Sequence, residues 1–185
     1  MNDYFKTQIP VFNQHWAEIA PFFTAITVPE KTTLLREGDI AHNIYFVDAG
    51  AVRLWHNDDG RDITVQFFFE NQIVASFQSL TEQTPSQFSL ETLAPTQLTK
   101  LSYPHFNQLV EKYPALQQTM THQISSRFMT YMTYFLSRIQ NNPEQRVIDL
   151  MANEPDILAR VPHHYIASYL GMTPVSFSRI QKRLR

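Results

Sequence analysis

The C-terminal segment from Val161 to Arg185 constrains the fold more than any other stretch, because it contains two short helical patterns separated by a turn. Pro162 suits the first turn of a helix, and Gly171 favours the left-handed conformation that ends one. Thr173 and Pro174 then supply a cap and a first-turn proline for a second helix. Apolar residues recur with helical spacing on both sides of the turn, at Ile166, Ala167 and Leu170 and then at Phe177, Ile180 and Leu184. The segment therefore predicts a helix-turn-helix.

The same end of the chain concentrates positive charge. From Ile157 onward there are five Lys or Arg and no Asp or Glu, although the net charge of the chain is −2. These cations are Arg160, Arg179, Lys182, Arg183 and Arg185. A local group of cations can neutralise phosphates without making the whole surface attract nucleic acid. A solvated terminal helix is the alternative, since Lys and Arg are common near helix C-termini, but the coincidence of turn, cap and charge favours DNA binding.

The composition indicates a folded chain of one or two domains. Of its 185 residues, 43% are hydrophobic and 17% are charged, which is enough apolar material for a core. Cysteine is absent, which excludes disulfides, thiolate metal sites and cysteine-ligated iron–sulfur clusters. Met1 to Ala25 does not have the basic start and apolar core of a signal peptide, and no apolar run reaches the length of a membrane span. We therefore expect a cytoplasmic protein with no membrane partner.

The N-terminal part changes from a helical to a strand-like pattern. Apolar residues at gaps of three and four predict a short amphipathic helix, interrupted or restarted at Pro10: Phe5, Ile9, Phe12, Trp16 and Ile19. From Pro21 to about Ser102, short apolar runs cut by turn signals predict strands. Asp58-Asp59-Gly60 lies between two such runs and predicts a hairpin. Repeated short strands at this spacing predict a β-sandwich or barrel of the jelly-roll kind.

A long helix follows. No Gly or Pro interrupts the chain from Ala115 to Asn142, which corresponds to about seven turns and a length near 40 Å. Its apolar stripe consists of Leu116, Met120, Ile124, Phe128, Tyr131, Phe135 and Ile139. The stripe could pack on its own β domain. Because a helix of this length exceeds most small domains, we expect part of the stripe to meet its copy in a homodimer.

The helix that begins at Asn142-Pro143-Glu144 leads into the C-terminal pair and gives the domain boundary. We therefore divide the chain into three parts. Residues 1–114 form a β-roll effector domain with flanking helices, residues 115–141 form a dimerisation helix, and residues 142–185 form a helix-turn-helix domain.

The order of these elements and four short motifs resemble the cyclic AMP receptor protein/FNR (CRP/FNR) family of bacterial transcription regulators. The motifs are LREGD (Leu35 to Asp39), YFVDAG (Tyr45 to Gly50), the DDG hairpin and IASYLGMTPVSFSRI (Ile166 to Ile180). The resemblance implies an α+β fold with a cyclic-nucleotide-binding-like β-roll (jelly roll), a long dimerisation helix and a C-terminal, winged-helix-like helix-turn-helix. It also implies a homodimer, an effector pocket in the roll, and a recognition helix in the major groove of double-stranded DNA. RNA polymerase is the further expected partner.

The resemblance also assigns DNA contacts. The recognition helix would be Thr173 to Leu184, with Thr173 and Ser176 near phosphates and Arg179 on a base edge. Pro174 and Val175 stand where relatives often carry an arginine and a glutamate, so the target sequence should differ. The full expected set is His163, His164, Tyr165, Thr173, Pro174, Val175, Ser176, Arg179, Lys182 and Arg183. The two adjacent histidines are expected to be polar surface and no metal is expected, because neighbours on a helix point apart.

The effector pocket departs from the family pattern. Relatives that bind cyclic nucleotides carry Gly-Glu followed by Arg-Ser or Arg-Thr, whereas Phe88 stands here where the arginine should be. A buried anion without a cation is costly, so cyclic AMP and cyclic GMP are not expected and no cofactor is identified. Candidate pocket residues for an unknown small-molecule effector are Gln72, Val74, Ser76, Phe88, Ser89 and Thr133. A roll that binds nothing and only supports the dimer is an equal alternative, and haem on a histidine such as His42 stays open.

Three functions compete at this point. The leading one is a dimeric DNA-binding transcription regulator without catalytic activity. The second is a small-molecule or cyclic-nucleotide sensor whose C-terminal helices dock a protein partner. The third, a metal-dependent cupin-like enzyme, is disfavoured because the seven histidines are scattered and no closely spaced His/Glu group falls within the strands.

Overall fold

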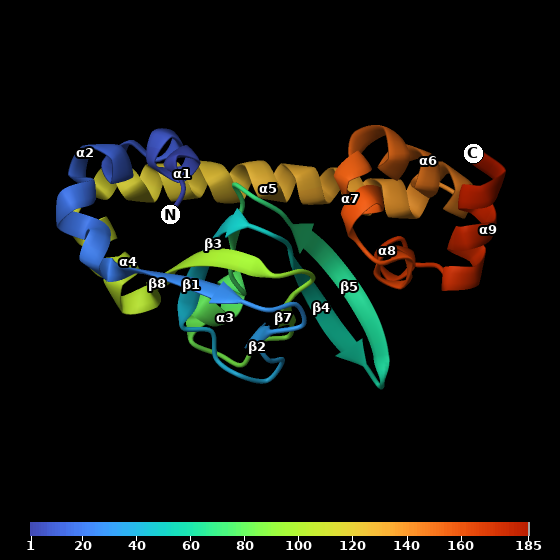
Figure 1. Cartoon of the computed structure of the whole chain (residues 1–185), viewed down its shortest axis with the longest axis horizontal. Coiled ribbons are helices and arrows are strands. Elements are labelled where there is room, and N and C mark those ends of the chain that lie inside the picture. Colours follow the sequence, from blue (N-terminus) through green and yellow to red (C-terminus); the bar gives the residue numbers. More distant parts are fainter. Residues whose placement is uncertain (185) are drawn as a thin grey trace.

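The computed structural model describes residues 1–184. One long helix, α5 (Pro114–Gln140), extends across the molecule. The β-sheets lie along one side of it, and the C-terminal helices gather around its far end (Figure 1). The expected α+β class, with a β-roll followed by a long helix and C-terminal helices, is confirmed.

Two helices and a short 3-10 turn precede the sheets: α1 (Asp3–Gln8), α2 (Pro10–Ile19) and η1 (Ala20–Phe22). Pro10 begins the second helix rather than interrupting one, because a proline at the first helical position loses no hydrogen bond. The predicted apolar face is buried, with Phe5, Ile9, Phe12 and Ile19 at most 2% exposed. The Phe5 ring meets Phe46 of the roll edge to face at 5.0 Å, so these helices close one end of the roll.

The roll consists of two four-stranded antiparallel sheets, ordered β1-β8-β3-β6 and β2-β7-β4-β5. The strands are β1 (Phe23–Val28), β2 (Thr33–Leu35), β3 (Asn43–Ala49), β4 (Val52–Asp58), β5 (Arg61–Phe68), β6 (Ile73–Val74), β7 (Ser89–Thr92) and β8 (Thr96–Ser102). A short helix, α3 (Phe77–Glu82), connects β6 to β7. Between the sheets lies a core that includes Val47, Val52, Leu90 and Leu98. The expected jelly-roll architecture is therefore present.

The predicted hairpin joins β4 to β5. Asp58 pairs with Arg61 at its tip, and the two residues between them, Asp59 and Gly60, have φ values of 50° and 87°. A two-residue turn with both φ values positive matches the twist of the flanking strands, which explains the Asp-Gly sequence. The hairpin extends from the roll toward α8 (His163–Tyr169) of the C-terminal helices (Figure 1).

Helix α4 (Tyr103–Lys112) leads from β8 into α5, and Ser102 caps it by accepting a hydrogen bond from the His105 N–H at 3.4 Å. Leu116, near the start of α5, is fully buried against the roll. Beyond it the apolar stripe emerges from the protein, and Phe128, Tyr131 and Ile139 are 60%, 53% and 66% exposed. Leu116 and Met120 therefore pack within the chain, whereas the later part of the stripe is largely exposed.

The C-terminal part contains α6 (Pro143–Asn153), α7 (Pro155–Arg160), α8 and α9 (Pro174–Leu184). The sequence predicts that the helix beginning at Asn142 leads directly into the C-terminal pair. The prediction missed α7, which begins because Pro155 again occupies a first-turn position. Between residues 142 and 184 the structure describes no strand, so the helix-turn-helix is present without a wing of its own. The strand that lies against α8 is β5, from the roll.

One hydrophobic cluster joins the two ends of the molecule. Val147, Ile157, Ile166 and Phe177 of the C-terminal helices are at most 2% exposed. Three residues of the roll belong to the same cluster: Ala51, Phe67 and Leu93. The Phe67 ring meets the Tyr169 ring at 5.2 Å. The core of the C-terminal helices is therefore completed by side chains of the roll.

Candidate DNA-binding surface and ligand cavity

The turn between α8 and α9 has the geometry that the sequence predicts. Gly171 has a φ of +68°, and the Met172 N–H donates to the Ala167 carbonyl at 3.0 Å. At the start of α9 the Thr173 hydroxyl accepts from the Ser176 N–H at 3.2 Å. This cap fixes the direction in which α9 leaves the turn.

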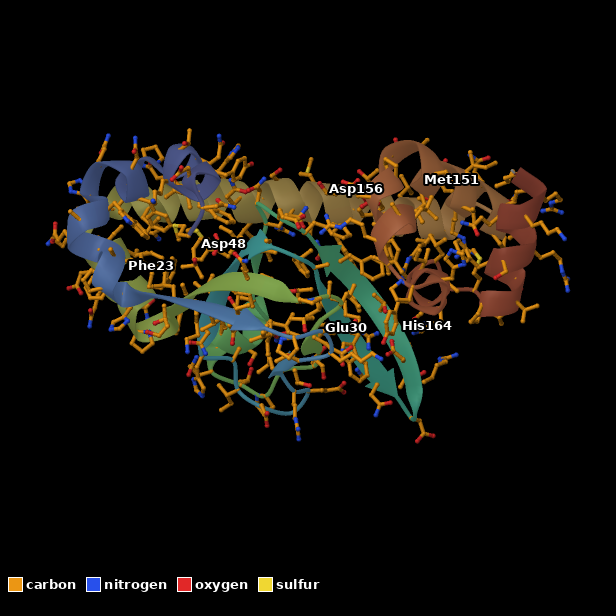
Figure 2. All side chains as sticks on the ribbon, viewed as in Figure 1. Phe23, Glu30, Asp48, Met151, Asp156 and His164 are labelled. Carbon is orange, nitrogen blue, oxygen red and sulfur yellow. The ribbon has the colours of Figure 1, made fainter. Side chains whose placement is uncertain are left out.

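The outer face of α9 is open to solvent. Phe177 and Ile180 point into the core, and Val175 on the opposite side is 67% exposed. Thr173, Pro174, Arg179 and Lys182 are also exposed, whereas Ser176 is half-buried. Sequence reasoning missed Ser178, which is exposed on this helix. Nitrogen-tipped side chains project outward around the last helix (Figure 2).

Ion pairs divide the predicted cations into two groups. Arg160 pairs with Glu70 at 2.7 Å, and Arg183 pairs with Glu144 at 2.9 Å. Within residues 1–184, Arg179 and Lys182 have no carboxylate partner. Arg185 lies outside the described residues. The two unneutralised cations therefore project from the helix that carries the exposed Val175.

The histidines at the start of α8 point apart. The His163 ring lies 5.3 Å from Phe177, and the His164 ring lies 3.9 Å from Tyr165. His164 sits where the C-terminal helices approach the hairpin (Figure 2). Within residues 1–184 no group of His, Asp and Glu is arranged to hold a metal ion. Both imidazoles are exposed, so they can reach a polar partner.

Tyr165, one of the predicted DNA contacts, packs against the roll instead of facing solvent. It is half-buried, and its ring lies 3.7 Å from the guanidinium of Arg53 on β4. Burial raises the pKa of its phenol. Arg53 is only 2% exposed and pairs with Asp62 at 2.7 Å and Glu91 at 2.9 Å. Tyr165 therefore attaches α8 to the roll through a buried cation.

Ser168, one turn later, continues this attachment. Its hydroxyl accepts from the Thr64 N–H at 2.9 Å and donates to the Asp62 carbonyl at 2.7 Å. We call the group of Arg53, Asp62, Tyr165 and Ser168 the docking contact. It fixes the first helix of the pair on the β4–β5 hairpin, while the outer face of α9 stays exposed.

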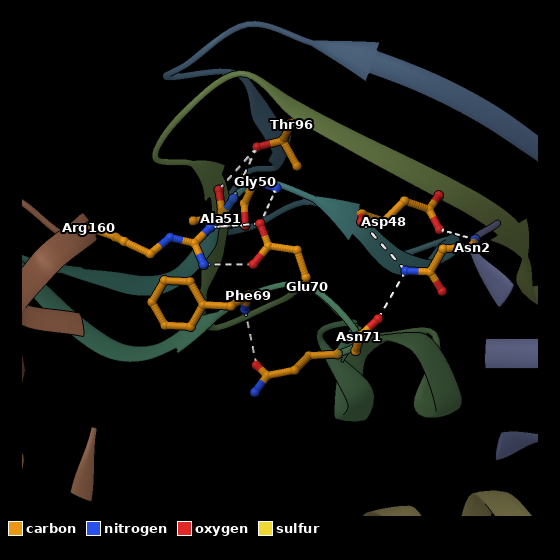
Figure 3. Close-up of polar contacts among 10 residues, drawn as sticks. Asn2, Asp48, Gly50, Ala51, Phe69, Glu70, Asn71, Thr96 and Arg160 are labelled. Atoms are coloured by element: carbon orange, nitrogen blue, oxygen red, sulfur yellow. Dashed lines mark hydrogen bonds and ion pairs between the residues drawn. The ribbon is translucent and has the colours of Figure 1, made fainter. Parts of the chain in front are cut away.

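A second attachment lies at Gly50, the last residue of the YFVDAG motif (Figure 3). The Gly50 N–H donates to Glu70 at 2.7 Å, and its carbonyl accepts from Arg160 at 3.0 Å. Gly50 has a φ of +102°, and an added Cβ would lie 2.6 Å from the Thr96 hydroxyl. Only glycine fits there, so the motif places a backbone group between the roll and α7.

The Arg160 guanidinium lowers the pKa of Glu70 to about 2. A depressed pKa stabilises the folded protein above the ordinary carboxyl pKa, near 4.5, and this stabilisation is lost as the pH falls toward 2. We expect the wild-type protein to unfold at higher urea concentration than Glu70→Gln at neutral pH, and this advantage to decline between about pH 4.5 and about pH 2. Urea denaturation at a series of pH values measures it.

The matched control is Glu82→Gln, which neutralises an exposed carboxyl on α3. Its stability difference from wild type should change little over the same pH range. An advantage of wild type over Glu70→Gln that persisted unchanged at pH 2 would contradict the role of the ion pair.

A cavity of about 710 Å³ lies between α5, α3, the N-terminal helices and strand β5. Of the six predicted pocket residues, Gln72, Ser76 and Phe88 line it. This volume is within the range of small-molecule sites.

The other three predicted residues lie elsewhere. Val74 is 1% exposed and points into the roll core, because alternate strand residues face opposite sides. Ser89 accepts a hydrogen bond from the Glu37 N–H at 2.9 Å. Thr133 is exposed on α5, where its hydroxyl donates to the Met129 carbonyl at 3.2 Å. The prediction that these three line the pocket was wrong in its geometry. Sequence reasoning also missed Arg127, which does line the cavity.

A smaller cavity of about 570 Å³ contains His42, the histidine considered for haem. Its described lining has no second His and no Met, and it includes the carboxylate of Asp39.

The fold defines a class: a ligand-cavity roll of the cyclic-nucleotide-binding kind, joined through a long helix to a helix-turn-helix. Residues 25–113 match the model of the cyclic nucleotide-binding domain. Two relatives are a global nitrogen regulator of Synechocystis, 25% identical over 95% of this chain and 83% of its own length, and the CRP-like protein Clp of Xanthomonas euvesicatoria, 24% identical over 85% and 75%.

Solved structures share the fold. The c-di-GMP-responsive global regulator CLP of Xanthomonas campestris has a TM-score of 0.77 at 20% identity, covering 93% of this chain and 91% of that one. A regulator from Eubacterium rectale assigned to the crp/fnr family also has a TM-score of 0.77, at 16% identity and with 96% and 87% coverage. The chain is therefore similar to CRP/FNR regulators in both sequence and fold. Among residues 1–184, no helix is both long and apolar enough to cross a membrane.

Proposed function

We propose that this protein is a dimeric, cytoplasmic DNA-binding transcription regulator without catalytic activity, which reads the major groove with α9. The observation that carries the proposal is the outer face of α9, where Arg179 and Lys182 have no carboxylate partner among the described residues and flank the exposed Val175. Arg179 can contact a base edge and Lys182 a phosphate. Thr173 and Pro174, at the N-terminus of α9, would approach the DNA backbone with Ser176.

The dimer would form through α5. Its exposed stripe from Ile124 to Ile139 includes Phe128, Phe135 and Leu136, which are 60%, 47% and 51% exposed. An apolar surface of this length on a soluble chain favours a partner, and a second α5 provides the same surface. In this division of labour, residues 1–114 sense an effector, residues 115–141 hold the dimer and residues 142–185 bind DNA.

The proposed regulator responds to a small molecule other than cyclic AMP or cyclic GMP. Phe88 lines the cavity where relatives that bind cyclic nucleotides carry the phosphate-binding arginine, and the described lining contains no Glu for the ribose hydroxyls. RNA polymerase is the proposed protein partner at promoters.

Selection of bound duplexes from a random pool tests the proposal. We expect enrichment of a roughly palindromic site whose half-sites lie about 34 Å apart, and an affinity that falls steeply with salt because bound phosphates release counterions. No enrichment and no salt-dependent duplex binding would favour the alternative, in which the C-terminal helices dock a protein.

Replacing Arg179 by alanine should weaken binding to the selected site by about 1–3 kcal/mol and relax discrimination at one base pair of each half-site. Fluorescence anisotropy against the selected duplex and its single-base variants measures both effects. Arg36→Ala is the matched control, because it removes the same charge from an exposed position on the roll. Equal losses in the two variants would remove the base-reading role of Arg179.

A further inference from the structure

The charge of the 710 Å³ cavity is unusually simple. Among the described residues that line it, Arg127 of α5 is the one ionised side chain, and the lining contains no Asp, Glu, Lys or His. A wall whose one charge is positive repels a metal ion or an organic cation and has no carboxylate to offset that repulsion. It also has no carboxylate to accept hydrogen bonds from the hydroxyl groups of a ribose. The net charge of the cavity wall is therefore one positive charge.

The Arg127 guanidinium is held in this wall without a charged partner. It makes no ion pair with the described residues 1–184, and it lies 5.1 Å from the ring of Phe68. Burial lowers its pKa, with no carboxylate nearby to oppose the shift. An arginine that is partly removed from water and left unpaired is costly, and an anionic ligand would offset that cost.

The rest of the wall is suited to an apolar body with a few polar groups. Nine aromatic residues line it, among them Phe68, Phe77, Phe88 and Phe106. Many of the polar side chains in the lining are neutral amides, including Gln66 and Gln123. Amides can fix the orientation of a ligand but do not select its charge.

From this juxtaposition we propose that the cavity binds a small organic anion with one carboxylate and a flat apolar body, and that Arg127 pairs with the carboxylate. The inference rests on the proposed role of the cavity as the effector site and names the chemical class of the effector. It places the missing cation on α5 rather than at the position of Phe88.

This position gives the ligand a direct effect on the dimer helix. Arg127 is followed in α5 by Phe128, which both lines the cavity and belongs to the exposed apolar stripe. A carboxylate that draws the guanidinium into the cavity fixes this turn of α5. An occupant would therefore bias the helix through which the two chains meet.

The test compares two probes of the same shape. 2-Naphthylacetate carries one carboxylate on a flat aromatic body, and 2-naphthylacetamide replaces it with a neutral amide. We expect isothermal titration calorimetry on the full-length protein, without DNA, to give at least about tenfold tighter binding of the acid. In Arg127→Gln this preference should disappear, whereas Arg36→Gln, with the same change in net charge at an exposed site, should retain it.

Three outcomes would overturn the proposal: equal affinity for the two probes, a preference for the acid that survives in Arg127→Gln, or no binding of either probe at about 1 mM. The probe comparison uses the unaltered protein and so stands even if Arg127→Gln does not fold. Because no DNA is present, failure here leaves the duplex selection unaffected, and failure of the duplex selection leaves this result unaffected.

Discussion

Replacing Arg53 by alanine is expected to lower the free energy of unfolding by about 3 kcal/mol, because it leaves two carboxylates beside a buried site without their cation. Asp62 and Glu91 both pair with Arg53, and their side chains are 38% and 17% exposed, so solvent screens the loss only in part. The same change removes the stacking contact with Tyr165. Urea denaturation measures the stability, and amide hydrogen exchange should become faster in α8.

Arg61→Ala provides the control on the neighbouring strand. Arg61 also pairs with an aspartate, Asp58, but its side chain is 74% exposed, so the expected change is below about 1 kcal/mol. Arg53→Lys keeps the charge but loses the planar fork that reaches both carboxylates, so an intermediate effect is expected. If Arg53→Ala and Arg61→Ala unfolded at the same urea concentration, the docking contact would not stabilise the protein.

Phe128→Asp should convert the proposed dimer to monomers at micromolar concentration, because it places a charge in the middle of the apolar stripe of α5. Sedimentation equilibrium measures the mass directly. Since Phe128 also lines the cavity, Phe135→Asp is the companion variant: Phe135 is on the same stripe, 47% exposed, and outside the cavity lining.

Ser126→Asp is the control for the helix itself. Ser126 is exposed on the opposite side of α5 from Phe128. The Ser126→Asp variant therefore adds the same negative charge to the helix but places it outside the apolar stripe. Both stripe variants should dissociate and Ser126→Asp should not. If the wild-type protein were already monomeric at these concentrations, the proposed dimer would be contradicted and the apolar stripe would have to bind a different partner.

Local sequence signals were sufficient for the elements whose geometry depends on neighbouring residues. The cap at Thr173, the left-handed Gly171 and the turn at Asp59-Gly60 are all present where the sequence predicts them. Pro10 and Pro155 show the limit of such signals, because a proline can begin a helix as well as break one. The prediction missed α7 for that reason.

The contacts that connect the two ends of the molecule could not be predicted in this way. Arg53 lies in a strand pattern, where an arginine normally faces solvent, and Tyr165 lies in a helix that was expected to face DNA. Only the tertiary arrangement brings their side chains to 3.7 Å. Arg127 had one usable signal: it is the single Lys or Arg between Pro114 and Ser137. Its place in the cavity wall still depends on how α5 packs against the roll.

The shared hydrophobic cluster determines which piece of the protein can be transplanted. A hybrid made by joining residues 142–184 to the roll of a relative would lose Ala51 and Phe67, which help to bury Tyr169 and its neighbours. The exposed apolar surface would favour aggregation. The portable unit is therefore the C-terminal helices together with the part of the roll that completes their core, including Ala51, Phe67 and Leu93. Exchange of the proposed DNA specificity between relatives is safest when it is confined to the outer face of α9.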